Sequence, residues 1–132
     1  MLLLSPTVSF GSFTFTDVVS ATVSRSPVRT VADHADTGPH VAFADVPEYQ
    51  TTIRLVGRVN KDDLNVPTPG HHATLKLVTT AEGSDRPRRA VSAACTLIES
   101  RYECSELKGC IRTLDFVAVS DGAADPISVA DA

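Results

Sequence analysis

The sequence predicts a mainly β protein, a small antiparallel β-sandwich or barrel with a long protruding hairpin loop and at most one short helix. The clearest strand pattern covers residues 51–59, where Ile53, Leu55 and Val59 alternate with polar side chains, as a half-buried strand requires. Val, Ala and Thr are abundant and Trp is absent, a composition that suits pleated surfaces and thin cores. No stretch repeats apolar residues at the spacing of a long helix.

The length of 132 residues indicates a single domain, which we place at residues 1–120. Folding a chain of this size hides roughly two-thirds of its surface, so a self-sufficient core is possible. Residues 121–132 are small and acidic, and we expect them to form an extended tail that leaves the fold.

Short strands open the domain at residues 7–10 and 13–16, on either side of a turn at Gly11. The next strand is expected at residues 18–25, with Val19, Ala21 and Val23 on one face. Pro27 interrupts this strand, which is typical of a strand end or an edge strand because proline cannot donate to the ladder.

Residues 27–47 form a long polar excursion, and connections longer than about 12–15 residues are usually functional. Its flanks, 28–31 and 41–46, could pair as the arms of a protruding hairpin that turns near Gly38. One subunit cannot bury the apolar face of such a hairpin, so the excursion indicates assembly. Its predicted contact residues are Asp33, His34, Asp36, Gly38, Pro39, His40 and Phe43.

The second half of the chain predicts three longer strands. They cover residues 72–80, 90–103 and 110–120. The apolar alternation changes phase at Leu97 and Ile98, which predicts a β-bulge or a strand that passes from the core to a subunit contact. Residues 61–65 could form one helical turn with Asn60 as its cap.

The formal charge of −4 and the pI of about 5.4 argue against binding to a phosphate backbone, since Lys and Arg supply that affinity. Basic residues gather only at 25–29 and 86–89, and we interpret both clusters as solvated loops.

Three cysteines, an odd number, argue against a disulfide framework. Cys104 and Cys110 flank an expected hairpin turn and could bridge, but we favour three reduced thiols, with Cys95 packed as a small hydrophobe.

The sequence predicts no enzyme, no cofactor and no metal site. His71 and His72 are adjacent, so on a strand they point to opposite faces, and no third or fourth ligand follows at a zinc-site spacing. No nucleophile motif or phosphate-binding glycine loop occurs. The apolar run at residues 2–4 is too short for a signal peptide and nothing predicts a membrane anchor, so we expect a protein made in a cytoplasm.

Four segments together resemble bacteriophage tail tube proteins: Val8-Ser9-Phe10-Gly11, and the stretches at 18–25, 38–47 and 116–120. The resemblance spans most of residues 7–120. It implies a small β-sandwich or barrel, six copies of which form a ring in the tail of a long-tailed phage, of contractile or non-contractile type. Rings stack into a tube that conducts DNA during ejection, and a long hairpin after the second strand reaches the neighbouring ring. The sequence departs from the family in having no clear amphipathic helix beyond residues 61–65.

The implied partners are other copies of the chain, with sheath, tail terminator and baseplate proteins as further candidates. The implied location is the virion, after assembly in the host cytoplasm. A tube wall that lets DNA slide should be acidic or small polar, which makes Glu99, Glu103 and Asp115 candidates for the lumen. Two other classes stay open: another ring-forming virion protein, such as a tail terminator, head–tail adaptor or baseplate hub ring, and a monomeric ligand-binding β module or small enzyme.

Overall fold

The computed structural model describes residues 2–5, 7–36, 38–59, 67–81, 88–107, 109–120, 122 and 124–131. Within these residues the chain forms strands, turns and bends but no helix, so the mainly β prediction is confirmed. No described segment is a helix that could cross a membrane. The predicted helical turn at 61–65 lies outside the described residues.

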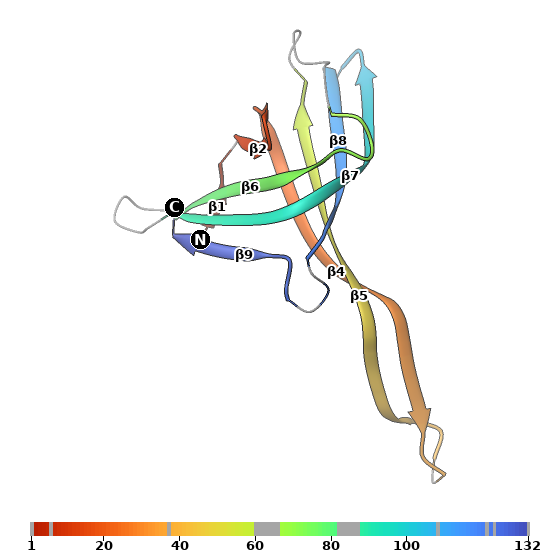
Figure 1. Cartoon of the computed structure of the whole chain (residues 1–132). Coiled ribbons are helices and arrows are strands. Elements are labelled where there is room, and N and C mark those ends of the chain that lie inside the picture. The colour runs from red at the N-terminus through yellow and green to blue at the C-terminus, as the bar shows by residue number, and fades with distance from the viewer. Residues whose placement is uncertain are drawn as a thin grey trace.

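The described strands belong to one antiparallel sheet. They are β1 (Leu2–Leu4), β2 (Val8–Phe10), β3 (Phe13–Phe15), β4 (Val18–His34), β5 (Val41–Arg58), β6 (His72–Ala81), β7 (Arg89–Ser105), β8 (Gly109–Ala118) and β9 (Ser128–Asp131). The sheet order is β3-β2-β6-β7-β8-β5-β4, while β1 pairs with β6 and β9 pairs with β7 (Figure 1).

The sheet curls back on itself, because its two end strands, β3 and β4, are separated in the chain only by Thr16 and Asp17. Asp17 has a φ of 56°, and its carbonyl accepts the N–H of Arg58 at 3.1 Å. Gly57 lies directly beneath this corner, where an added Cβ would be 3.1 Å from the Asp17 oxygen. The close approach of the Asp17 carbonyl therefore disfavours a side chain at residue 57 on the facing strand.

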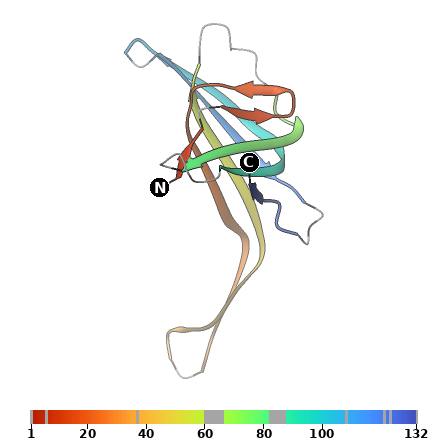
Figure 2. The ribbon, with the colours of Figure 1, turned by 90° about the vertical axis from the view of Figure 1, so that its left-hand side faces the viewer.

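The core lies between the two layers that this curl creates. The β2–β3 hairpin and β6 cross over the long strands β4, β5 and β8 (Figure 2). The rings of Phe10, on β2, and Phe116, on β8, meet across the layers with centroids 4.8 Å apart. The buried cluster also contains Val8, Phe15, Val18, Ile53, Leu55, Leu75, Leu77, Ala93, Cys95, Leu97, Leu114 and Ala118.

Strict alternation fills this core, as the sequence predicts. Ile53 and Leu55 point inward from β5 while Arg54 is exposed, and Leu114 and Phe116 do the same from β8. The pairing of β7 with β8 shifts register between Leu97 and Glu99, so the predicted bulge is confirmed.

Two details of the strand predictions are wrong. Val18, not Val19, is buried, because the β4–β5 register shifts between Val18 and Ser20 and turns Val19 to the surface. The C-terminal tail does not leave the fold in its described part, since β9 pairs with β7 from Ser128↔Ser92 to Asp131↔Arg89.

The interpretation of three reduced thiols is also wrong. Cys104 and Cys110 are register partners in the β7–β8 hairpin and are joined by a disulfide. Cys95 is free and buried, as expected for a small core residue, and this burial raises the pKa of its thiol to about 11.

Candidate functional site

The β4–β5 hairpin projects well beyond the core, as Figures 1 and 2 show from two directions. Its two strands pair from Val18↔Gly57 to His34↔Val41. The side chains of β5 from residue 41 to 50 are all exposed, and burial begins only at Thr51. The far half of this hairpin, residues 27–50, is called here the arm.

The arm contains the predicted excursion, but its strands run further than expected. Asp33 pairs with Phe43 and His34 with Val41, so these residues lie on strands rather than in a loop. The connection itself contains the remaining predicted contact residues, Asp36, Gly38, Pro39 and His40. The sequence therefore located the segment correctly but placed the loop boundary too early.

Large apolar side chains are exposed along the arm. Phe43 is 55% exposed and Tyr49 59% exposed. Val28, Val41 and Val46 are exposed as well. A two-stranded hairpin of this kind is at best marginally stable in water by itself, so these side chains are the natural contact points for another surface.

Register shifts bend the arm. The pairing slips between Pro27 and Arg29, again between Arg29 and Val31, and once more between Asp33 and His34. Bulges of this kind increase local twist and change the direction of a strand.

The basic cluster at 25–29 lies on β4, not in the solvated loop that the sequence predicts. Residues 86 and 87 of the other cluster lie outside the described residues, and Arg88 and Arg89 are exposed.

The C-terminal segment fastens the base of the arm. Arg25 Nη2 donates to Asp125 Oδ2 at 2.8 Å. The other carboxylate oxygen of Asp125 accepts the N–H of Ile127 at 3.0 Å. The N–H bond from Ile127 and then the bond from Arg25 lower the pKa of Asp125, because both stabilise the ionised carboxylate.

The predicted lumen residues share one surface. We define the open face as the side of β4, β5, β8 and β7 that points away from the core. Asp115 alternates with buried residues on β8, and its register partners on either side are Arg54 and Glu99. Glu103 lies on the same face of β7, opposite Ile111.

The open face is not uniformly acidic. Arg54 Nε donates to Asp115 Oδ1 at 2.8 Å, and this hydrogen bond and the charge of Asp115, with a smaller attraction from Glu99, raise the pKa of Arg54. A shallow groove of about 540 Å³ lies beside this pair. Hydroxyl and amide side chains of β4 and β5, including Thr22, Ser24 and Gln50, make up half of its lining residues, and Ile98 forms part of its apolar wall.

Two of the four histidines, His71 and His72, contact neighbouring side chains of the sheet. His71 packs edge-on against the rings of Phe10 and Phe13, and His72 Nδ1 lies 2.7 Å from Thr96 Oγ1. Among the described residues no group of three or more His, Cys, Asp or Glu side chains is arranged to hold a metal ion.

One buried charge, that of Arg112, was not identified from the sequence. Arg112 is buried on β8, with its guanidinium carbon 4.7 Å from the centre of the Phe15 ring. The signal was present, because the same alternation that buries Leu114 and Phe116 also turns Arg112 inward.

Comparison with known proteins adds no relative: no protein-family model matches the chain, and no curated protein matches it. The surfaces that remain for a functional interpretation are the arm and the open face.

Proposed function

We propose that this protein is the structural subunit of a phage tail tube, assembling into hexameric rings that stack around a lumen through which DNA passes. The observation that carries the proposal is the arm, which places apolar side chains beyond the subunit's own core. The resemblance of the four sequence segments to tail tube proteins supplies the family.

The arm supports assembly because the subunit cannot bury it. Phe43 and Tyr49 remain more than half exposed in the single subunit. Burial of apolar area is the main favourable term in association, at roughly 25 cal/mol per Å². Contact between this arm and a neighbouring copy would recover the area that the single subunit leaves in water.

The edge of the sheet supports the same proposal. β4 ends the strand order, and in the described part of the chain only β5 pairs with it. A long edge strand presents unpaired backbone N–H and C=O groups, which soluble proteins normally protect. Closure of neighbouring subunits into a ring would cover such an edge.

Head-to-tail contact accounts for stacking. The end of the arm and the end of the β7–β8 hairpin lie at opposite ends of the molecule (Figure 1). A contact between different surfaces of identical subunits is heterologous, and it continues into a filament when it does not close. The proposed tube is such an assembly, and it requires neither a catalytic group nor a cofactor.

Electron microscopy of the purified full chain over a range of concentrations tests the proposal, with light scattering on the same samples. The expected result is tubes of stacked rings. If the protein forms closed single rings that never stack, the tube proposal is wrong and the alternative of an adaptor or terminator ring is favoured. A strictly monomeric protein at high concentration would overturn both.

The double variant Phe43→Ser/Tyr49→Ser should shift the material toward single rings or monomers. Val129→Ser is its matched control, because Val129 is equally exposed but lies on β9 rather than on the arm. Equal loss of assembly in both variants would contradict the role of the arm.

A further inference from the structure

The end of the β7–β8 hairpin carries a disulfide that lies outside the hydrophobic core. The Cys104–Cys110 bond lies beyond the buried part of β7, whose side chains from residue 101 to 105 are all exposed. Neither cysteine belongs to the hydrophobic cluster around Phe10 and Phe116. The bond therefore lies outside the buried core.

The backbone brings the two sulfur atoms together without help from the bond. Register pairs continue on both sides of the cysteines, from Glu103↔Ile111 to Ser105↔Gly109. Gly109 has a φ of 71°, which lets the chain turn tightly at this point. Reduced cysteines would stay opposite each other, so closing the bond requires little loss of conformational freedom.

The third cysteine provides an internal contrast. Cys95 is buried in the core, and burial raises the pKa of its thiol to about 11, so at neutral pH almost no reactive thiolate forms. Cys104 is exposed and Cys110 is partly exposed, so reagents in solution reach this pair. Exposed disulfides of this kind are the ones that exchange readily.

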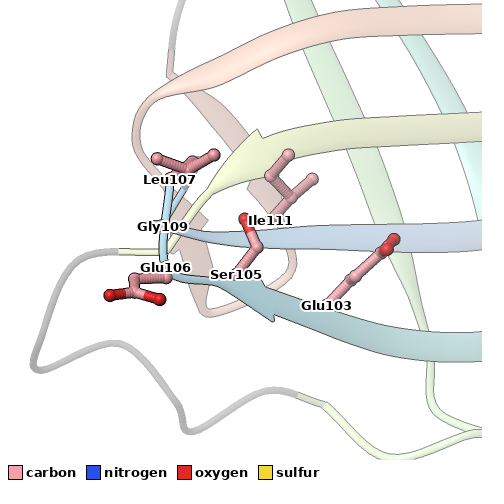
Figure 3. A pocket seen from close by; sticks show the side chains of 6 residues that line it. All are labelled: Glu103, Ser105, Glu106, Leu107, Gly109 and Ile111. Atoms are coloured by element: carbon pink, nitrogen blue, oxygen red, sulfur yellow. The ribbon is translucent and has the colours of Figure 1, made fainter.

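A hollow lies on the face of the hairpin end opposite the bond. A cavity of about 430 Å³ is lined by Glu103, Ser105, Glu106, Leu107, Gly109 and Ile111. Figure 3 shows Leu107 and Ile111 on one side of the hairpin end, with Glu106 pointing outward. Leu107 is 97% exposed, so the disulfide clamps the turn that presents an unshielded apolar side chain.

We propose that Cys104 and Cys110 form a reversible thiol–disulfide exchange site whose oxidation clamps the end of the β7–β8 hairpin, and whose substrate is a low-molecular-weight disulfide such as oxidised glutathione. One cysteine thiolate attacks a glutathione sulfur, forms a mixed disulfide and releases one glutathione thiolate. The other cysteine thiolate attacks the cysteine sulfur of that mixed disulfide and releases the second. The two cysteines lose two electrons and two protons, and the glutathione disulfide takes up both. The inference does not depend on the proposed tube.

The test uses the folded full chain in glutathione buffers of graded redox ratio, quenched with acid, alkylated and analysed by intact-mass and peptide mass spectrometry. Oxidising buffers should protect Cys104 and Cys110 and leave no free thiol at either. Reducing buffers should free both while the circular dichroism spectrum stays native. Cys95 should react only after denaturation in every buffer.

Matched variants separate exchange from simple exposure. Cys104→Ser should stop at a mixed disulfide of Cys110 with glutathione, and Cys104→Ser/Cys110→Ser should show no redox response. Amide hydrogen exchange at residues 105–111 should be on the order of tenfold faster in the reduced protein than in the oxidised one, and the double variant should match the reduced protein.

Any one of the following results would overturn the proposal. A pair that stays reduced in oxidising buffer, or that bridges only to other molecules, is not an intramolecular exchange site. A bond that opens only in denaturant is a permanent staple rather than a reversible one. Identical amide exchange at the hairpin end in both redox states would show that the disulfide does not restrain this end.

Discussion

The guanidinium carbon of Arg112 lies 4.7 Å from the centroid of the Phe15 ring, and Arg112 is only 2% exposed. This contact connects β8 with β3, which belong to opposite layers of the curled sheet. A guanidinium stacks on an aromatic face with its planar surface, and desolvation strengthens the attraction.

Replacement of this arginine by lysine should destabilise the fold. Arg112→Lys keeps the charge but loses the flat stacking surface, and we expect a loss of about 1–2 kcal/mol in the free energy of unfolding. Urea unfolding followed by circular dichroism measures it. Arg101→Lys, at an exposed position on β7, is the control and should stay within about 0.5 kcal/mol of the wild type. Equal effects at both positions would show that the stack contributes nothing.

The corner between β3 and β4 gives a second prediction about stability. In Gly57→Ala the new Cβ would lie 3.1 Å from the Asp17 carbonyl oxygen and 3.3 Å from the Val18 Cα, both backbone atoms. Because backbone cannot move aside easily, we expect a cost of about 1–3 kcal/mol. Urea unfolding followed by circular dichroism measures this cost, and Gly38→Ala, where no atom lies within 4 Å, should be nearly neutral in the same assay. A neutral Gly57→Ala would mean that the corner relaxes freely.

The alternation that predicts these strands is visible in the sequence because it is local. Side chains two residues apart on a strand share a face. The pairs Leu75 and Leu77, and Leu114 and Phe116, therefore indicate a buried face even when the neighbouring strand is not known. The bulge after Leu97 was visible for the same reason, since it breaks that period.

Features that depend on distant partners were not predictable. Val18 replaces Val19 in the core only because β5 imposes a register shift. β9 forms because residues 128–131 pair with residues 89–92 of β7, which are distant in the sequence. The Cys104–Cys110 bond is local, and the sequence allowed it, but the choice between a bridge and free thiols depended on the exact register of the hairpin. The sequence pattern indicates the exposed hairpin and the acidic residues of the open face. It does not indicate which partner covers these surfaces, because that depends on a second molecule.

Deletion of residues 33–40 tests the function of the arm. The segment holds the polar end of the hairpin, and its described residues are exposed, so each subunit should still fold. Ring-on-ring stacking should be lost, because the contact residues Asp33 to His40 are gone. Electron microscopy and circular dichroism together decide the outcome. An unfolded deletion variant would show instead that the end of the arm belongs to the folding unit.

The attachment of the C-terminal segment should respond to acid. The bonds from the Ile127 N–H and from Arg25 hold the pKa of Asp125 below its ordinary value of 3.8. A lowered pKa in the folded state contributes stability above the unfolded value, and this contribution is lost as the pH falls through the folded pKa. The contacts of Asp125 should therefore persist at neutral pH and disappear only below about pH 3.8.

Carboxyl NMR titration measures the Asp125 midpoint directly. Arg25→Gln should raise this midpoint only in part, since the Ile127 N–H is the larger cause of the shift. Arg54→Gln, at an arginine whose partner is Asp115, is the control and should leave the Asp125 midpoint unchanged. A midpoint for Asp125 at or above 3.8 in the wild type would contradict the two bonds.

The open face gives the last prediction, which concerns the wall of the proposed tube. Duplex DNA carries about one negative charge per 1.7 Å of axis, so an unpaired cation on the wall would hold it through counterion release. Asp115 neutralises Arg54 at 2.8 Å, and Glu99 lies across β8 from the same arginine. The exposed Arg58 and Arg101 lie on the same face. Asp115→Asn should therefore free the Arg54 charge beside them and increase salt-dependent duplex binding to assembled tubes above the wild-type level, measured by fluorescence anisotropy at graded ionic strength. Thr113→Asn, at the next open-face position on β8, adds an amide without removing a charge and should leave duplex binding at the wild-type level. The electrostatic map of an assembled ring is the decisive observation, because a lumen lined mainly by Arg and Lys would contradict an acidic or small polar wall and the placement of Glu99, Glu103 and Asp115 on it.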